Sequence, residues 1–201
     1  MLRYTAAFSH GLDLVNAALL DRGDVVLVEA GNYAGALTRL AALGVEYIGI
    51  ELDDDGMRAD ALEAVLADLV AKGRTPKFIY MIPTIQNPTG TVMSLERRQA
   101  ILKLAQDHGV PIFEDDCYAD LVFANERPPA FHALDDTGSV IYCGTFSKTI
   151  APALRVGYLV TPWPLMGRIL PLKTDAGSGM LEQMVLAMLL QVLCRITIVI
   201  L

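Results

Sequence analysis

Short apolar runs alternate along the chain with longer segments whose apolar residues recur at helical spacing. The runs are predicted to be buried strands, at residues 25–29, 45–50, 77–82, 111–114, 140–143 and 157–160. The longer segments are predicted to be helices, at residues 11–20, 33–43, 58–71 and 94–108. Because strands and helices alternate, the pattern predicts an α/β fold: a three-layer sandwich with a mostly parallel sheet and helices on both of its faces.

Residues with turn and capping chemistry stand at the ends of these segments. Gly44 and Gly73 follow two predicted helices, and Ser94 stands where a helix cap is expected. Residues 53–56, Asp-Asp-Asp-Gly, are predicted to form a solvated acidic turn. A calcium loop would need further ligands at alternating positions, so no metal site is expected there. Residues 124–136 are rich in proline and charge and are predicted to be a loop.

The composition fits one well-buried domain. The chain has 201 residues, of which 53% are apolar and 19% charged, as expected for a sheet that is covered on both faces. The formal net charge of −7, with no visible cluster of Lys and Arg, argues against a nucleic-acid surface. No nucleic-acid partner is therefore expected.

Three cysteines, Cys117, Cys143 and Cys194, have neither metal nor disulfide spacing. They are predicted to be reduced thiols of a cytoplasmic protein, and residues 1–5 lack the apolar core of a secretory signal. Residues 180–201 are almost wholly apolar, but Gln191 and Arg195 would lie within any span. No membrane segment is therefore expected.

Side chains with catalytic chemistry follow three of the predicted strands. Lys148 comes directly after a serine and seven residues before an arginine. This arrangement indicates a reactive amine beside an anion-binding site. A lone Ser-Lys pair is usually a solvated surface turn, but here further polar side chains follow neighbouring strands. In open α/β sheets, ligands bind at the carboxyl ends of strands. Four side chains are therefore expected to meet in one crevice: Asn87, Asp115, Tyr118 and Lys148.

Three motifs together resemble one family. They are Gln-Asn-Pro-Thr-Gly at residues 86–90, Asp-x-x-Tyr at residues 115–118, and Ser-Lys at residues 147–148 with Arg155. From about residue 5 to about residue 187 the chain resembles the aspartate aminotransferase-like large domain of class I/II, fold-type I, pyridoxal-phosphate-dependent aminotransferases. The resemblance is to the branch that includes 2-aminoadipate and kynurenine aminotransferases and the aminotransferase-like half of MocR regulators.

The resemblance implies pyridoxal 5'-phosphate as the cofactor and a catalytic set of Lys148, Asp115 and Tyr118. Lys148 would hold the cofactor aldehyde as a Schiff base and later carry a proton. Asp115 would pair with the ring nitrogen and keep it protonated. Tyr118 and Asn87 would hydrogen-bond the phenolate oxygen of the ring. The neighbouring Asp116 lacks the family's spacing to Tyr118 and is expected to cap a helix or to support the site from outside.

The same resemblance implies a phosphate site and a stacking residue. Arg155 would pair with the phosphate, and Thr145 and Ser147 would donate hydroxyl hydrogen bonds to it. Tyr33 matches the aromatic residue that stacks on the cofactor ring. The family's Gly-Ser-Gln phosphate loop is replaced here by Ala-Phe-Ser at residues 7–9, a change that weakens the expectation of tight binding.

The domain organisation is implied in the same way. Residues 1–190 would form the cofactor-binding large domain without the N-terminal arm of the family. Residues 191–201 would form an atypical apolar tail in place of the C-terminal small domain. Neither Arg168 nor Arg195 matches the arginine with which the family binds the substrate carboxylate.

The predicted activity is the transamination of an amino acid to a 2-oxo acid, and the family implies a homodimer. Two alternatives stay open. The chain would serve as the effector-sensing domain of a MocR-type transcription regulator, which its acidic charge disfavours, or it would be a truncated remnant without catalytic competence. The missing arm, the changed phosphate loop and the apolar tail favour the remnant.

Overall fold

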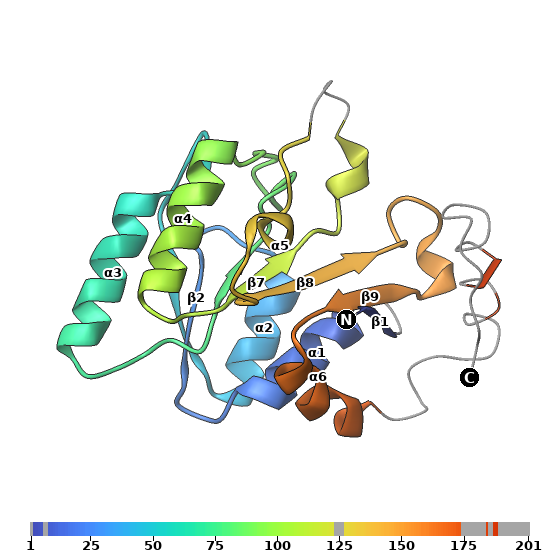
Figure 1. Cartoon of the computed structure of the whole chain (residues 1–201), viewed down its shortest axis with the longest axis horizontal. Coiled ribbons are helices and arrows are strands. Elements are labelled where there is room, and N and C mark those ends of the chain that lie inside the picture. The colour runs from blue at the N-terminus through green and yellow to red at the C-terminus, as the bar shows by residue number, and fades with distance from the viewer. Residues whose placement is uncertain (1, 6–7, 123–126, 174–183, 185–186, 189–201) are drawn as a thin grey trace.

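A mixed sheet organises the chain (Figure 1). The structure, a computed structural model, describes residues 2–5, 8–122, 127–173, 184 and 187–188. Within them the sheet has seven strands in the order β1-β9-β8-β7-β6-β2-β3. Strands β2, β3, β6, β7 and β8 run parallel to one another, whereas β9 is antiparallel to both β8 and β1. The strands are Leu2–Thr5 (β1), Val25–Glu29 (β2), Glu46–Ile50 (β3), Ile79–Met81 (β6), Ile112–Asp115 (β7), Val140–Thr145 (β8) and Gly157–Val160 (β9).

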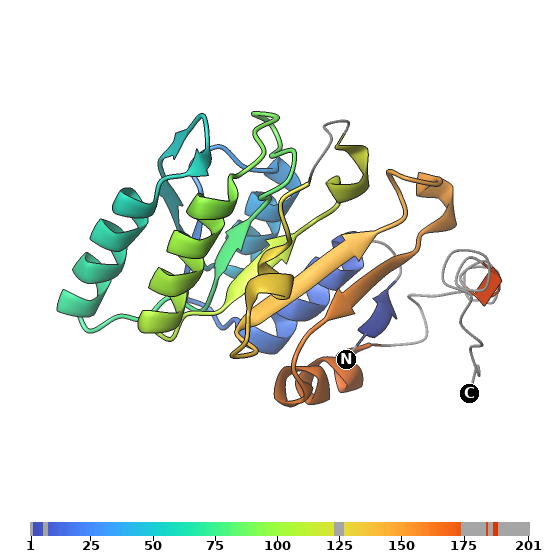
Figure 2. The same cartoon turned by 45° about the horizontal axis from the view of Figure 1, so that its top comes forward.

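Helices cover both faces of the sheet (Figures 1 and 2). One face carries Phe8–Leu19 (α1), Ala34–Leu43 (α2) and Trp163–Ile169 (α6), and the other carries Ala59–Ala71 (α3), Leu95–Asp107 (α4) and Phe131–Leu134 (α5). Leu12 of α1 shares one buried core with Val28 of β2, and Leu66 of α3 shares the second core with Leu27. Adjacent strand residues thus point to opposite faces. The predicted three-layer sandwich with a mostly parallel sheet is confirmed.

The predicted helix caps form. Gly44 ends α2 in the left-handed conformation, with a φ of 71°. Ser94 Oγ accepts a hydrogen bond from the backbone amide of Arg97 at 3.4 Å at the start of α4. Helix α1 differs from the prediction, because it begins at Phe8 rather than at residue 11. Ser9 therefore lies in the first turn of a helix and not in a loop.

The predicted acidic turn forms, whereas the predicted loop contains a helix. Asp54 and Asp55 are exposed and make the turn between Leu52–Asp53 (β4) and Gly56–Met57 (β5), a two-stranded hairpin, and Asp53 pairs with Arg97 at 2.9 Å. Helix α5 forms within the predicted loop 124–136 because Phe131 is buried and because its backbone amide donates to the carboxylate of Glu114 at 2.8 Å. The remaining short elements are the single-turn helices Ala119–Leu121 (η1), Pro152–Leu154 (η2) and Leu170–Leu172 (η3).

A buried arginine connects the segments around α4. Arg98 is fully buried and donates hydrogen bonds to the backbone carbonyls of Met93, Pro83 and Pro129, at 3.0, 2.9 and 3.3 Å. Its guanidinium also lies 3.8 Å from the carboxylate of Glu114. A buried charge is tolerated only when it is paired and hydrogen-bonded, and Arg98 meets both conditions. It therefore anchors the loop that follows β6 and the loop that precedes α5.

The thiols Cys117 and Cys143 are buried and free, as predicted. Cys194 and most of the apolar segment 180–201 lie outside the described residues. In the part of the chain that the structure describes, no helix has the length and apolar character needed to cross a membrane.

Candidate active site

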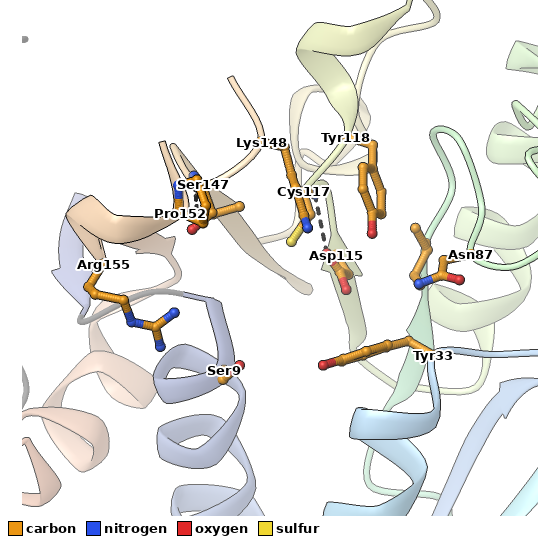
Figure 3. A pocket seen from close by; sticks show the side chains of 12 residues that line it. Ser9, Tyr33, Asn87, Asp115, Cys117, Tyr118, Ser147, Lys148, Pro152 and Arg155 are labelled. Carbon is orange, nitrogen blue, oxygen red and sulfur yellow. Dashed lines mark hydrogen bonds between the residues drawn. The ribbon is translucent and has the colours of Figure 1, made fainter. Parts of the chain in front are cut away.

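One cavity opens at the carboxyl ends of β6, β7 and β8, beside the N-terminus of α1 (Figure 3). All the residues that the sequence predicts for the site line this cavity: Tyr33, Asn87, Asp115, Tyr118, Thr145, Ser147, Lys148 and Arg155. They come from different strand ends and loops, as the rule for open α/β sheets anticipates. The same cavity is also lined by Ser9, Ile82, Cys117 and Pro152.

Lys148 stands in the turn between β8 and η2, with its amine over the ring of Tyr118. The Nζ atom lies 5.8 Å from the ring centroid, and the side chain is exposed. A hydrogen bond of 2.9 Å from the amide of Ile150 to the carbonyl of Phe146 closes the turn. The backbone thus holds the lysine at the mouth of the cavity while the amine itself stays accessible.

Asp115, the last residue of β7, is the buried carboxylate of the cavity and is only 3% exposed. Its Oδ2 accepts a hydrogen bond from the Tyr80 hydroxyl at 2.7 Å, and its Oδ1 accepts one from the Cys117 amide at 3.2 Å. Burial raises the pKa of Asp115 to about 6, and the hydrogen bonds act against that rise. Among the described residues no ion pair includes Asp115, so hydrogen bonds alone balance its charge.

Tyr118 and Asn87 approach one another at the same edge of the cavity. A hydrogen bond from the Asn87 side chain opposes the rise in the Tyr118 pKa that burial causes. Tyr33 directs its hydroxyl into the cavity (Figure 3). The ring of Tyr33 lies so close to Gly35 that a Cβ atom at position 35 would clash with it. A glycine at this position therefore permits the orientation of Tyr33.

The hydroxyls of Thr145 and Ser147 form one hydrogen-bonded unit at the end of β8. Thr145 Oγ1 lies 3.1 Å from the Val156 carbonyl oxygen and 2.9 Å from Ser147 Oγ, and it accepts the Ser147 amide at 3.1 Å. A carbonyl oxygen can only accept hydrogen bonds, and the Thr145 hydroxyl has a single proton. When Thr145 donates that proton to the Val156 carbonyl, the hydroxyl proton of Ser147 remains available for donation. Arg155 has a φ of 49° and directs its guanidinium toward Ser9 (Figure 3).

Behind the cavity, Glu29 and Gln86 hold the turn that carries Asn87. Glu29 Oε2 accepts hydrogen bonds from the Ile82 amide and from Gln86 Nε2, each at 3.1 Å. Gln86 Oε1 accepts the backbone amide of Thr89 at 2.9 Å. Burial raises the pKa of Glu29 to about 8. The position of Asn87 is thus set partly by a side chain from another strand, β2.

Tyr80, Glu29 and Ser9 are residues that the sequence does not single out. Tyr80 and Glu29 act through partners 35 and 57 positions away in the chain, so no local pattern marks them. Ser9 would have been recognised if the first helix had been predicted to begin before residue 11. Asp116 accepts the Tyr142 hydroxyl at 2.9 Å, and its side chain caps no described helix. Of its two expected roles, helix cap or support from outside the site, the first is therefore wrong, and Asp116 lies behind the cavity lining beside Asp115.

The chemistry of the cavity suits pyridoxal phosphate. Arg155, Ser147 and the N-terminus of α1 lie at one end, as binding of a phosphate dianion requires. Asp115 lies deeper in the cavity, and its carboxylate can pair with a protonated ring nitrogen. Lys148 at the mouth offers the amine for an aldehyde. Within the described residues, no group of three or more His, Cys, Asp or Glu side chains could hold a metal ion.

Known proteins are similar to this chain in sequence. The profile of the family described as "Aminotransferase class I and II" matches residues 2–193. The uncharacterized HTH-type transcriptional regulator YisV of Bacillus subtilis is 38% identical over 177 residues, which are 86% of this chain and 35% of its own length. Aromatic-amino-acid aminotransferase 1 of Thermococcus litoralis is 39% identical over 155 residues, which are 77% of this chain and 37% of its own length.

A solved structure superposes closely. LysN, an alpha-aminoadipate aminotransferase from Thermus thermophilus complexed with N-(5'-phosphopyridoxyl)-L-leucine, matches with a TM-score of 0.87 at 34% identity. The match covers 94% of this chain and 49% of that chain. The chain therefore spans between about a third and about a half of the length of these relatives.

Proposed function

Because the chain belongs to the class I and II aminotransferase family, we propose that it forms the cofactor-binding part of a pyridoxal-phosphate-dependent transaminase. The proposed reaction converts an amino acid to its 2-oxo acid. One observation carries the proposal: a lysine, a buried carboxylate and an arginine from three segments of the chain line the same cavity. They are Lys148, Asp115 and Arg155.

Lys148 would attach the cofactor covalently as a Schiff base. Its ε-amine would be the group that holds the cofactor aldehyde. The same amine would take the proton from the substrate α-carbon and later return a proton. The position of Nζ over the Tyr118 ring, 5.8 Å from its centroid, supports both roles, because the amine reaches the cavity from its mouth.

The remaining side chains would bind and orient the ring. When bound, the cofactor supplies an electron sink that stabilises negative charge at the substrate α-carbon. Asp115 would hold a proton on the ring nitrogen, because a buried carboxylate favours a cation beside it. Tyr118 and Asn87 would donate hydrogen bonds to the phenolate oxygen, and Tyr33 would stack on the ring face.

The phosphate would bind between Arg155 and the N-terminus of α1. Arg155 would supply the positive charge, and Ser147 would donate its hydroxyl hydrogen bond. Thr145 would orient Ser147 through its contacts with Ser147 and the Val156 carbonyl. It would donate its own hydroxyl to the phosphate when its single proton is not given to that carbonyl. The backbone amides of the first turn of α1 would complete the anion site, with Ser9 in that turn.

The proposal extends to the wider protein. Residues 1–190 would be the large domain, and the protein would act as a cytoplasmic homodimer on amino acids and 2-oxo acids. An effector-sensing domain of a transcription regulator is the second candidate, because the 38% identity to the HTH-type regulator nearly equals the 39% identity to the aminotransferase. Such a domain would bind the same cofactor without needing turnover.

The two candidates differ in one half-reaction. Cofactor-loaded protein is mixed with a panel of amino acids, and the released 2-oxo acid is quantified by mass spectrometry. A transaminase releases about one equivalent of 2-oxo acid per site and then turns over when a second 2-oxo acid is added. A sensing domain binds the amino acid with a spectral change and releases none.

Borohydride trapping tests the cofactor site itself. The protein is mixed with pyridoxal phosphate, its visible absorbance is recorded, the mixture is reduced, and the labelled peptide is mapped. The pyridoxyl label is expected on Lys148 and is expected to be lost in Lys148→Ala. Lys103→Ala is the control, because Lys103 pairs with Asp107 at 2.7 Å on α4. A folded protein with no visible band, or with label scattered over surface lysines, would contradict the proposal and favour the remnant.

A further inference from the structure

We propose that Tyr80 is a positioning residue for Asp115, and that its hydroxyl keeps this carboxylate ionised and directed at the ring nitrogen of the cofactor. The inference rests on the proposed function, which assigns Asp115 to that nitrogen. Tyr80 belongs to β6 and Asp115 to the neighbouring parallel strand β7. The Tyr80 hydroxyl donates to Asp115 Oδ2 at 2.7 Å.

The strand register explains why these two side chains meet. Tyr80 pairs with Phe113 across the sheet, and Asp115 lies two residues further along on the same face. The rings of Tyr80 and Phe113 pack edge to face, with centroids 5.6 Å apart and planes at 73°. The packing fixes the ring of Tyr80, so its hydroxyl has one direction, toward the carboxyl end of β7.

Burial restricts Tyr80 to an indirect role. Tyr80 is 1% exposed and is absent from the residues that line the cavity. Its hydroxyl would be costly to bury without a partner, and Asp115 supplies that partner. A hydrogen bond to an ionised acceptor is stronger than one to a neutral acceptor, so this contact favours the charged form of Asp115. Tyr80 can thus influence a ligand only through the carboxylate.

Burial and two acidic neighbours act against Tyr80 by favouring the protonated form of Asp115. Burial and the negative charge of Asp116 both favour the protonated carboxyl, and Glu29 adds a further acidic neighbour from β2. Cys117 opposes them by donating to the carboxylate. The titratable groups that interact with Asp115 come from β2, β6 and β8 and from the segment that follows β7. They are Glu29, Tyr80, Cys143, Asp116, Cys117 and Tyr118.

Loss of the Tyr80 hydroxyl therefore has a defined consequence. Asp115 takes up a proton more readily, and its Oδ2 loses the contact that fixes the carboxylate plane. Less of the carboxylate is then ionised and aimed into the cavity. The ion pair between Asp115 and a protonated ring nitrogen then becomes weaker. The cofactor therefore binds less tightly, and its ring nitrogen gives up its proton more easily.

Tyr142 provides a matched control from the same sheet. Its hydroxyl donates to Asp116 Oδ2 at 2.9 Å, which repeats the tyrosine-to-aspartate contact one residue further along the chain. This second pair lies on the face that carries α5, where the Tyr142 ring is 6.0 Å from the ring of His132. It lies outside the residues that line the cavity.

The test compares the unaltered chain with Tyr80→Phe and Tyr142→Phe. Two quantities are measured: the Kd for pyridoxal phosphate, and the chemical shift of the ring nitrogen in cofactor labelled with nitrogen-15. Tyr80→Phe is expected to raise the Kd about tenfold and to move the resonance toward that of the neutral ring. Tyr142→Phe reaches Asp115 only through Asp116, whose charge it disfavours, so it is expected to leave the Kd unchanged or to lower it by less than about twofold. A Tyr80→Phe variant that matches the unaltered chain in both quantities overturns the inference.

A double-mutant cycle separates positioning from folding. In Asp115→Asn, which has no carboxylate to position, adding Tyr80→Phe is expected to change the Kd by less than about twofold. A further tenfold loss in that background would mean that Tyr80 supports the fold, and would overturn the inference. Fluorotyrosine at position 80, a stronger donor that keeps the ring, is expected to tighten binding. An unaltered chain that takes up no cofactor refutes the proposed function, whereas normal uptake with a silent Tyr80→Phe refutes this inference alone.

Discussion

The ε-amino nitrogen of Lys148 lies 5.8 Å from the centroid of the Tyr118 ring. The contact joins the turn after β8 to the segment after β7, and a hydrogen bond from Asn87 holds Tyr118 in turn. A cation over an aromatic ring at an exposed site contributes about 0.5–1 kcal/mol. The lysine, the phenol and the amide therefore form one chain of contacts across the mouth of the cavity.

Replacing Tyr118 with Phe removes the hydroxyl and keeps the ring. We expect the Kd for pyridoxal phosphate to rise about fivefold, as for the loss of one hydrogen bond, while borohydride label stays on Lys148. Titration of the visible absorbance and peptide mapping measure the two effects. Tyr47→Phe, at an exposed tyrosine of β3, serves as the control. Label that leaves Lys148 in Tyr118→Phe would mean that the hydroxyl, and not the ring, positions the amine.

The local motifs made most of this site predictable. Asn87 lies within a five-residue motif, Asp115 stands three residues before Tyr118, and Lys148 stands seven residues before Arg155. Each motif follows an apolar strand, so the rule for parallel sheets brings them to one edge. The lining of the cavity agrees with that reasoning, while the chemical role of each residue stays a prediction.

The parts that escaped prediction depend on tertiary contacts. Tyr80 reads as one more apolar strand residue, and only the alignment of β6 with β7 gives its hydroxyl a partner. Helix α5 depends on the Glu114 carboxylate at its N-terminus. The direction of β9 is equally hidden, because an apolar run has the same pattern in parallel and antiparallel strands.

Three buried carboxyls make the stability of the cofactor-free protein fall as the pH rises. Burial raises the pKa of Asp115 to about 6, of Glu114 to about 7 and of Glu29 to about 8. Each group keeps its proton in the folded state over a range in which the unfolded chain has released it. The contribution of these three carboxyls to the free energy of unfolding therefore decreases from about pH 4.5 to about pH 8, and they cause no further loss above that pH.

Urea unfolding at about pH 6 and about pH 8.5 measures this loss. Glu29→Gln is expected to reduce the difference between the two conditions, because Glu29 has the highest pKa of the three. Glu63→Gln, at an exposed position of α3, should leave the difference unchanged. A free energy of unfolding that increases over this range would contradict the expectation.

The Gln86 side chain is expected to be important for both the fold and the site. Gln86→Leu removes the donor to Glu29 and leaves the Thr89 amide without its acceptor, so we expect a loss of about 2–4 kcal/mol in unfolding free energy. Cofactor affinity should fall as well, because Asn87 is the next residue. Chemical denaturation and absorbance titration check the two effects. Gln106→Leu, whose side chain bonds Asp135 near the surface, should cost less than about 1 kcal/mol.

Gly144 permits the close approach of Tyr158 from β9. The two residues are paired in the sheet, and a Cβ atom at position 144 would clash with the Tyr158 ring. Gly144→Ala is expected to lower the free energy of unfolding by about 1–3 kcal/mol and to weaken cofactor binding, since the lysine turn follows directly. Adding Tyr158→Val should restore most of the loss.

The control for this experiment is Gly167→Ala in α6, where an added Cβ atom meets no other atom within 4 Å. It should raise the free energy of unfolding by about 0.5–1 kcal/mol, because alanine favours helix more than glycine does. Thermal and urea unfolding measure both variants. If Tyr158→Val did not rescue Gly144→Ala, a cause other than the ring contact would have to be sought.

Strand β1 precedes all other strands of the sheet in the chain, yet it lies at an edge and pairs with β9, as Thr5 does with Gly157. On the ribosome, β1 therefore emerges long before its neighbour. The Asp115 side of the cavity can form once β7 has joined β6. The anion-binding end must wait until β9 has been synthesised, because the Arg155 segment leads into β9. Assembly of the site during translation thus has an order, and the phosphate end is completed last.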